Sequence, residues 1–506
     1  MKNKPSFPTA ILLFALALVF TVWASSAQAA DQKPNIVFIM ADDLGYSELG
    51  SYGQKKIRTP HLDQLAKEGM RFTRHYSGNA VCAPSRCVLM TGKHPGHAWV
   101  RTNKATKPLG QEPIPASEVT VAELLQKQGY ATGAFGKWGL GRPGSSGDPL
   151  KQGFDRFFGY NCQSRAHSYY SDYLQDDDKH FALKNNPVLP GHASLAEGAD
   201  PLDPKSYAMF KGTDYASDHI NDEALKFMRK NKDRPFYLYY PTMIPHVALH
   251  VPDEELAPYL KLGWKEKPFT GRNANGKRYG YTPHMTPKAA YAAMISRMDR
   301  YVGKLLKQLD ELDLAENTIV VFTSDNGTTH LGDEVDYEFF ESVGPLRGLK
   351  GSLYEGGVRV PLIVRWPGHV KAGTVSDYVS GFEDWLPTLL EVVGDSSEVP
   401  EGLDGVSLVS VLEGKKQQAR DLLYREFPSY GGQQALWSGK WKAVKQNMSK
   451  GNTEIELYDL SQDEGEANNV AAQNLEVVKR MRQQMDEQHV PSEVFPLPTY
   501  EKRKKK

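Results

Sequence analysis

The chain has 506 residues, 61 of them basic (Lys and Arg) and 61 acidic (Asp and Glu), so its formal net charge is zero. With 40% hydrophobic and 24% charged residues, it has the composition of a globular protein with a large core, which excludes a disordered or membrane-embedded chain. The balanced charge also excludes the positive surface of a general nucleic-acid binder, and the basic tail at residues 502–506 is too short to provide one.

The first residues have the layout of a secretory signal peptide. Lys2 and Lys4 precede an apolar run over residues 10–23, and the small residues Ala27 and Ala29 occupy the cleavage positions. We therefore predict a signal peptide over residues 1–29 and an exported chain, periplasmic or secreted. The apolar run is short for a membrane span, so we expect no stable membrane insertion.

Export permits disulfide bonds, but the chain has only three cysteines, at positions 82, 87 and 162. This number excludes a disulfide scaffold. A bridge between Cys87 and Cys162 stays an open alternative at this point.

Two segments that are distant in sequence share one pattern, an apolar run followed by two polar residues. Residues 35–40 form a nearly continuous apolar, β-branched run, which is typical of a strand covered on both faces, and Asp42 and Asp43 follow it. Residues 318–323 repeat this pattern and are followed by Asp325 and Asn326. Because a parallel sheet brings such strand ends together, these side chains offer several oxygen ligands to one hard divalent cation.

Calcium is our first choice for that cation, and magnesium also suits oxygen ligands. The alternative is structural: Asp-Asp and Asp-Asn-Gly sequences are each common in turns. Their joint occurrence after matching apolar runs favours a metal site.

Strands and helices alternate along most of the remaining chain. A capping box at residues 120–123 opens a helix that Gly129 can end, and a short strand over residues 131–135 leads to Lys137. Another strand, over residues 236–240, leads to His246. This order predicts an α/β fold with a mostly parallel sheet between helices, whose chemically distinctive residues follow the strand ends.

The alternation is interrupted over residues 139–215, which are rich in Gly, Pro, Asp and Tyr and which we interpret as substrate-facing loops. Leucines at helical spacing then predict a helix that Gly394 ends. We place a catalytic domain at residues 30–395 and a smaller α+β subdomain with a basic tail at residues 396–506. The subdomain is predicted to hold a hairpin (434–437 and 441–444), a third strand (455–460) and a final amphipathic helix with apolar positions at 475, 478 and 485.

The most informative motif is Cys82-Ala83-Pro84-Ser85-Arg86, followed by Thr91-Gly92. Proline suits a first helical turn, so we predict that a helix begins near Pro84 or Ser85. The helix N-terminus and Arg86 would then favour an anion beside Cys82. The alternatives are that Cys82 and Cys87 are small apolar core residues or zinc ligands, although a second Cys/His pair for zinc is lacking.

This motif resembles the signature of the formylglycine-dependent sulfatases, a family of the alkaline-phosphatase-like superfamily. The resemblance extends to Gly136-Lys137-Trp138, to Pro245-His246 and to the segment from Gly348-Leu349-Lys350 to Pro361, and so covers most of the mature chain. It implies that a maturation enzyme oxidises Cys82 to Cα-formylglycine, whose hydrate carries two hydroxyl groups.

The resemblance also implies the roles of individual residues. The metal would be held by Asp42, Asp43, Asp325 and Asn326, with residue 82 as an additional ligand. Arg86 would steady the formylglycine. Lys137, His246 and Lys350 would bind the sulfate group, and His246 would protonate the leaving oxygen.

In the mechanism that the resemblance implies, one hydroxyl of the hydrate attacks sulfur, activated by the metal and a carboxylate such as Asp325. The alcohol leaves, and the second hydroxyl then loses its proton so that sulfate is expelled and the aldehyde returns. A plain Ser or Cys has no second hydroxyl for this release.

The sequence departs from the family at one position. Many members have histidine after Gly-Lys-Trp, where this chain has Gly139. In the family that histidine contacts the formylglycine. We predict His167 as its substitute, with His97 as the second choice.

Three functions remain in competition. The first is an exported sulfatase acting on a sulfated carbohydrate, with sulfated galactose or N-acetylgalactosamine as the substrate suggested by analogy and aryl sulfates as artificial substrates. The second is a phosphatase or phosphodiesterase of the same superfamily, against which Cys82 argues. The third is an inactive glycan-binding homologue, motivated by Gly139. The oligomeric state is left open.

Overall fold

The computed structural model describes residues 33–273, 275–394 and 400–501. The predicted signal peptide, the basic tail and the residues on either side of the predicted domain boundary at 395 and 396 lie outside or at the edge of these ranges, so those assignments stay predictions.

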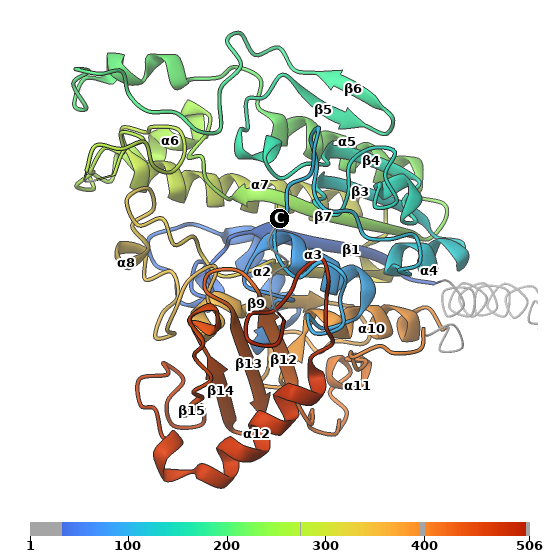
Figure 1. The fold of residues 1–506 in the computed structure, drawn as a ribbon. Helices are drawn as coiled ribbons and strands as arrows, with labels where there is room; N and C mark the ends of the chain where they lie inside the picture. Colours follow the sequence, from blue (N-terminus) through green and yellow to red (C-terminus); the bar gives the residue numbers. More distant parts are fainter. Residues whose placement is uncertain (1–32, 274, 395–399, 502–506) are drawn as a thin grey trace, which may run out of the picture.

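A sheet of eleven described strands forms the centre of the molecule (Figure 1). Its main order is β10-β2-β9-β8-β1-β7-β3-β4-β5-β6, and β11 (Ser380–Gly381) pairs with β2. In this order the strands are β10 (Thr374–Ser376), β2 (Met70–Tyr76), β9 (Arg359–Arg365), β8 (Thr318–Ser324), β1 (Asn35–Asp42), β7 (Phe236–Pro245), β3 (Ala131–Lys137), β4 (Arg156–Tyr160), β5 (Tyr173–Asp176) and β6 (Lys179–Ala182).

The prediction of a mostly parallel sheet is confirmed. The central strands β8, β1, β7, β3 and β4 are parallel neighbours. Antiparallel pairs occur toward the sides, where β9 pairs with both β8 and β2, and where β5 pairs with β4 and β6.

Strand β1 explains why its sequence is apolar throughout. Val37 and Ile39 face one core, while Ile36 and Phe38 face the other, and all four are fully buried. A strand with helices on both faces cannot alternate between apolar and polar residues. Residues of α2 (Pro60–Glu68), α5 (Ala216–Lys230) and α7 (Pro287–Glu311) pack in the first core, and residues of α3 (Cys82–Thr91), α4 (Val121–Lys127) and α10 (Trp385–Val392) in the second.

Several predicted boundaries were close to those observed. The capping box at α4 is confirmed, since the Thr120 hydroxyl accepts from the Glu123 amide and the Glu123 carboxylate accepts from the Thr120 amide. The predicted strand at residues 131–135 extends to Lys137, and the strand at 236–240 extends through two prolines to Pro245.

The segment at residues 139–215 is more regular than predicted. It contains β4, β5 and β6, which add one side to the sheet. These strands have four or five residues each, and Gly159 has φ +150°, so neither length nor side-chain alternation indicates them in the sequence. Loops still make up most of this segment, together with short 3-10 turns.

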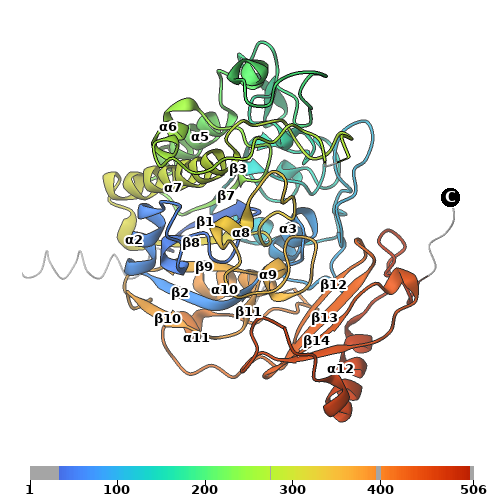
Figure 2. The ribbon, with the colours of Figure 1, turned by 90° about the vertical axis from the view of Figure 1, so that its left-hand side faces the viewer.

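The smaller C-terminal sheet is antiparallel, with the order β12 (Leu423–Phe427), β13 (Gln433–Ser438), β14 (Trp441–Lys445) and β15 (Glu456–Asp459). The predicted hairpin pairs β13 with β14, and β12 was missed. The final helix α12 (Leu475–Gln488) buries Met481 and Met485 against this sheet, which lies beside the main body (Figure 2). The other described helices are α6 (Asp253–Leu260), α8 (Tyr337–Phe340), α9 (Glu355–Val358) and α11 (Val409–Leu412).

Candidate active site

Four parallel strands carry the predicted site residues at their carboxyl ends. Strand β1 ends at Asp42 and β3 ends at Lys137, while Asp325 and His246 directly follow β8 and β7. The pairing register places Ala41 opposite Ser324, and the Asp325 amide donates to the Ala41 carbonyl at 3.0 Å. The sheet therefore brings residues from four distant segments to one edge, as predicted.

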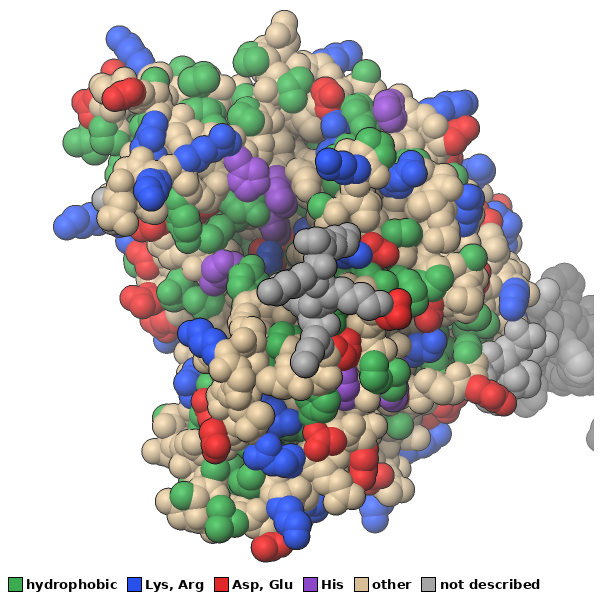
Figure 3. All heavy atoms as spheres, viewed as in Figure 1, with side chains coloured by type: hydrophobic (Ala, Val, Ile, Leu, Met, Phe, Trp, Pro, Cys, Tyr) green, Lys and Arg blue, Asp and Glu red, His purple; other side chains and the backbone are tan. Residues whose placement is uncertain are grey.

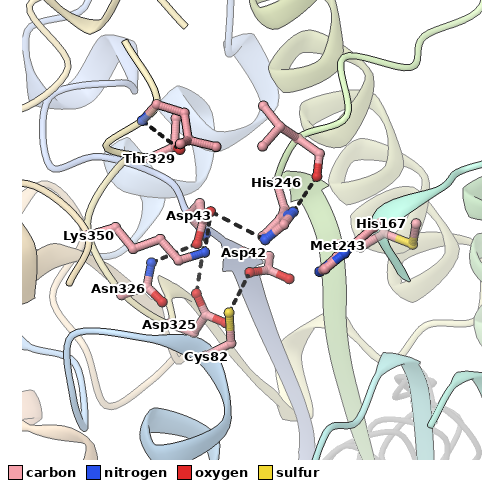
Figure 4. A network of polar contacts seen from close by, with 12 residues as sticks. Asp42, Asp43, Cys82, His167, Met243, His246, Asp325, Asn326, Thr329 and Lys350 are labelled. Carbon is pink, nitrogen blue, oxygen red and sulfur yellow. Dashed lines mark hydrogen bonds and ion pairs between the residues drawn. The ribbon is translucent and has the colours of Figure 1, made fainter. Parts of the chain in front are cut away.

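Helix α3 places Cys82 at the same edge. It begins at Cys82 itself, two residues before the predicted start at Pro84, and its N-cap Val81 has no side-chain cap. Cys82 thus stands in the first helical turn, with its side chain turned toward the strand ends. The Cys82 Sγ lies 3.4 Å from Asp42 Oδ1 (Figure 4). It also lies 3.5 Å from Lys137 Nζ.

Carboxylates and cations are paired in this cluster (Figure 4). Lys137 Nζ lies 2.5 Å from Asp42 Oδ2, and Lys350 Nζ lies 2.7 Å from Asp43 Oδ2. Asn326 Nδ2 donates to Asp43 Oδ1 at 2.8 Å. With Asp325 and Arg86, the cluster holds three buried carboxyl groups and three permanent cations, so its formal charges balance; Arg86 and Lys137 are buried, and the Lys350 side chain is 11% exposed.

Arg86 is fully buried and connects the two aspartate strands. Its Nε and one terminal nitrogen lie 3.1 and 2.7 Å from Asp325 Oδ2, and the latter is 3.5 Å from Asp42 Oδ2. Its other terminal nitrogen donates to the Lys137 carbonyl. This planar fork holds β8, β1 and β3 in a fixed relation behind residue 82.

Burial and neighbouring charges set the ionisation of the cluster. Burial, reinforced by the Asp42 carboxylate, raises the pKa of the Cys82 thiol to about 12, so a thiolate is strongly disfavoured at neutral pH. Burial opposes ionisation of Asp42, but the permanent cations Lys137, Arg86 and Lys350 more than offset it and hold the pKa of Asp42 well below its usual value. Lys350 stays charged, because Asp43 outweighs its burial and its pKa lies well above the usual value.

The donor set fits a hard cation. Asp42, Asp43, Asp325 and Asn326 supply oxygen atoms and are all at most 1% exposed. The Asn326 Oδ1 is buried and has no hydrogen-bond partner, as expected of an atom that is a metal ligand. Ligand atoms of Asp42, Asp43, Cys82 and His246 also lie within 4.8 Å of one another.

The two predicted histidines lie together. The rings of His246 and His167 are stacked, with centroids 5.3 Å apart and an interplanar angle of 7°. His246 Nδ1 donates to the Val247 carbonyl, and its Nε2 lies 3.7 Å from Asp43 Oδ2. Burial, together with neighbouring cations, lowers the pKa of both histidines well below the usual value, so both are neutral. His167 lines the pocket around Cys82, and its role as the substitute for the family histidine stays a prediction.

The second candidate for the missing histidine, His97, lies outside the site, so that prediction was wrong. His97 pairs with Asp404 at 2.9 Å, stacks on His94, and is not among the residues that line the pocket around Cys82. The space beside Gly139 is filled by Gln163, which sequence analysis missed: a Cβ at Gly139 would lie 3.0 Å from Gln163 Nε2. Gln163 is 5% exposed, and this nitrogen has no hydrogen-bond partner.

Residue 82 lies in a pocket of about 170 Å³. Figure 3 shows a hollow on this face, with charged side chains in its depth and histidines along its rim. Several lining residues could not be predicted, because they come from loops without a motif: Asn103, Gln163, Tyr281, Thr329, His330 and Tyr430. A larger cavity of about 680 Å³, lined by residues such as Tyr170, Tyr207 and His284, contains none of the predicted site residues.

The other cysteines take no part in this pocket. Cys87 is fully buried in the apolar core behind α3, so the core alternative applies to Cys87 and not to Cys82. Cys162 is buried as well, and all three cysteines are free, so the alternative of a bridge between Cys87 and Cys162 was wrong.

Comparison with known proteins decides the family. The family model described as Sulfatase matches residues 34–395. The chain belongs to the sulfatase family. A second model, described as the C-terminal part of N-sulphoglucosamine sulphohydrolase, matches residues 349–490 and so covers all four strands of the smaller sheet. The sulfatase fold and the activity of a sulfuric ester hydrolase follow from this membership, and the phosphatase alternative is not supported.

Characterised relatives cover most of the chain. Arylsulfatase A of Homo sapiens is 33% identical over 90% of this chain and 87% of its own length. The N-acetylgalactosamine-6-O-sulfatase of Bacteroides thetaiotaomicron is 30% identical over 90% of this chain and 93% of its own length. The steryl-sulfatase of Mus musculus is 32% identical over 86% and 75%, respectively.

Solved structures agree on the architecture. The crystal structure of Ps i-CgsB has a TM-score of 0.72 and 28% identity, and the match covers 90% of this chain and 92% of that one. A phosphonate monoester hydrolase of Agrobacterium radiobacter, with a TM-score of 0.60 and 22% identity, shares the fold. Among the described residues, no helix combines the length and apolarity that a membrane crossing requires.

Proposed function

We propose that this sulfatase is an exported enzyme that hydrolyses sulfate esters of a carbohydrate, with residue 82 converted from cysteine to formylglycine and calcium as its metal ion. One observation carries the proposal: Cys82, an oxygen-rich cation site and the side chains of Lys137, Lys350 and His246 all face one small pocket. Magnesium remains the second choice of ion.

Lys137 and Lys350 are proposed to bind the sulfate group. Their ammonium groups contact Asp42 and Asp43 at the base of the pocket and also line it, so an entering sulfate would lie against two fixed positive charges. As the S–O bond breaks, negative charge grows on the ester oxygens, and preorganised cations stabilise that charge at no cost in reorganisation.

The thiol of Cys82 is a poor candidate for the nucleophile, because its pKa of about 12 leaves almost no thiolate at neutral pH. A hydrated formylglycine at this position would supply a hydroxyl nucleophile and a second hydroxyl for sulfate release. A divalent ion held by Asp42, Asp43, Asp325 and Asn326 would lower the pKa of a bound hydroxyl. Arg86 would orient Asp325 beside residue 82 through its two short contacts.

His246 is proposed to pass a proton to the leaving oxygen. Its Nδ1 is engaged with the Val247 carbonyl, so its Nε2 is the nitrogen available to the pocket. Lys350 and Lys137 contribute to its lowered pKa, and a bound sulfate would offset their charge and favour the protonated ring. His167 stacks on His246 and is proposed to fix the orientation of that ring.

A carbohydrate substrate is supported by the relatives. Several are named as N-acetylgalactosamine-6-sulfatases, from mammals and from Bacteroides thetaiotaomicron. The structure of Ps i-CgsB has also been solved in complex with a neocarrahexaose, with a TM-score of 0.68 and 28% identity to this chain. We therefore propose sulfated galactose or N-acetylgalactosamine as the sulfated unit, and aryl sulfates as artificial substrates.

The test is sulfate release by protein co-expressed with a formylglycine-generating enzyme. The panel holds 6-sulfated N-acetylgalactosamine, sulfated galactose, 4-nitrophenyl sulfate and 4-nitrophenyl phosphate. We expect sulfate release from at least one sulfated sugar, and faster cleavage of 4-nitrophenyl sulfate than of 4-nitrophenyl phosphate. Lys137→Ala should lose sulfate release from the sugar and from 4-nitrophenyl sulfate. Faster phosphate cleavage would contradict the proposal, and sugar binding without sulfate release would favour the inactive homologue.

Export is tested separately by N-terminal sequencing of the mature protein. Cleavage after Ala29 is expected, and a cytoplasmic protein that retains Met1 would contradict it.

A further inference from the structure

The catalytic pocket is too small for a whole glycan. Its volume of about 170 Å³ lies below the roughly 300–1,000 Å³ of typical small-molecule sites. It can hold a sulfate group with part of one sugar ring, so the rest of a longer substrate must lie outside its mouth. What the mouth offers therefore decides how a chain of sugars is bound.

Tyr430 stands at this mouth, in the loop between β12 and β13. It lines the catalytic pocket, and its side chain is 59% exposed. Its ring is held from three sides: Phe427 at 5.5 Å, His330 at 5.8 Å, and the backbone of Gly351, where an added Cβ would lie 3.0 Å from Tyr430 Cε2. Gly351 follows the sulfate-binding residue Lys350, so the ring is fixed beside the sulfate position.

The backbone of this loop is unusual. Tyr430, Gly431 and Gly432 all have positive φ, at 47°, 91° and 74°. Glycines adopt such angles freely, but a positive φ costs conformational free energy at a tyrosine. The presence of tyrosine at this position therefore points to a function of its ring.

Tyr430 also lines a second hollow, a groove of about 630 Å³ on the C-terminal subdomain. The groove is built from the loop of Tyr430, the turn at Met448 and Ser449, and the segment at Pro498 and Thr499. Its single charged lining residue, Glu501, already accepts hydrogen bonds from the Ser492 amide and pairs with His489 at 3.1 Å. Among the described residues, the groove is thus lined by apolar and hydroxyl groups and by one carboxylate that is already paired.

We propose that this groove is a second carbohydrate subsite, in which the uncharged sugars that follow the sulfated unit bind, with Tyr430 stacking against the first of them. The inference rests on the proposed carbohydrate substrate. An exposed aromatic face beside hydroxyl groups suits the apolar face and hydroxyls of a neutral sugar, and no lysine or arginine is among the described residues that line the groove. Because one residue lines both hollows, a single chain can pass from the pocket over the ring into the groove.

Binding tests the subsite without catalysis. Neutral tetrasaccharides, prepared by desulfating carrageenan fragments, are titrated into the processed enzyme by calorimetry or saturation-transfer NMR. We expect one of them to bind to the wild type and to Tyr430→Phe, which keeps the ring. Tyr430→Gly removes the ring at a backbone position that suits glycine, and Ser449→Trp fills the groove from an exposed site. Tyr430→Gly is expected to weaken binding roughly tenfold, which corresponds to the loss of one stacked ring, and Ser449→Trp is expected to weaken binding because it blocks the groove.

Kinetics give the second readout. Tyr430→Gly should lower kcat/KM for a sulfated tetrasaccharide roughly tenfold. Ser449→Trp, which lies outside the catalytic pocket, should lower kcat/KM for the same substrate and leave turnover of 4-nitrophenyl sulfate within about twofold. Equal losses on both substrates, or neutral tetrasaccharides that bind to none of the proteins or to all of them equally, would overturn the subsite. If tetrasaccharides bind in a Tyr430-dependent way but no sulfated sugar is hydrolysed, the proposed function fails and the subsite stands.

Discussion

Removing the charge of Arg86 should destabilise the protein strongly. Arg86 has no exposed surface, and it compensates Asp325 at 2.7 Å and Asp42 at 3.5 Å. Burial and the neighbouring Asp42 already raise the pKa of Asp325 to about 7, and in Arg86→Gln this buried carboxyl group would lose its nearest positive charge. Breaking a buried ion pair in this way costs about 3–5 kcal/mol, because one partner stays uncompensated in a medium of low polarity.

This cost can be converted into a thermal shift. Unfolding entropy near 60 °C is about 2.1 cal/mol/K per residue, hence about 1 kcal/mol/K for a chain of this size, so the midpoint should fall by about 3–5 °C. Calcium should restore part of the lost melting temperature. An ion that binds only to the folded state stabilises that state by about 2.7 kcal/mol when its free concentration is a hundred times its Kd.

The assay is differential scanning calorimetry of metal-free and calcium-saturated protein. Arg74→Gln is the matched control: it removes an arginine whose partner Asp377 is exposed and 4.0 Å away, and such pairs contribute at most about 1 kcal/mol. If Arg86→Gln and Arg74→Gln melt within 1 °C of each other (an interval of about the shift expected for 1 kcal/mol), the reasoning about the buried cluster is refuted.

Three further predictions concern other parts of the molecule. Burial lowers the pKa of His75 to about 3 in the folded protein, against 6.5 in the unfolded chain, so the neutral ring stabilises the fold above pH 6.5 and this stability is lost as the pH falls. At pH 5 the loss is about 2 kcal/mol. In denaturant titrations between pH 6.5 and 4, the free energy of unfolding of His75→Phe should therefore decline less steeply than that of the wild type. Gly139→His should lower the free energy of unfolding by about 1–2 kcal/mol and should also lower sulfate release, because φ at this position is +87° and Gln163 fills the space beside it. Gly139→Ala is the control that isolates the backbone strain. Higher activity of Gly139→His would contradict this prediction and show that Gly139 impairs the enzyme. Chelation followed by dialysis should abolish sulfate release and lower the melting temperature, with calcium restoring both; unchanged activity in metal-free protein would contradict a metal at Asn326.

Much of the fold could be predicted because its central strands are buried on both faces. The apolar runs that became β1 and β8 have no other stable environment, and the oxygen ligands after them mark the edge where the strands end. The capping box of α4 is equally local, since its hydrogen bonds join Thr120 and Glu123. Such features can be read from a few neighbouring residues.

What sequence could not provide depends on distant contacts. Strands β5 and β6 have four residues each and exist only because they pair with β4 and with each other. Gln163 and Tyr430 belong to loops with no motif, and only the fold places one beside Gly139 and the other beside Lys350. His97 failed for the same reason: its nearest charged partner, Asp404, is distant in sequence.

The central claim is that residue 82 performs the chemistry as formylglycine. The most direct measurement is the rate of sulfate release as a function of the fraction of formylglycine at position 82, determined by peptide mass spectrometry on the same samples. We predict a proportional increase, with no release from Cys82→Ala. Sulfate release by Cys82→Ala, or by protein in which the thiol is fully retained, would contradict the account.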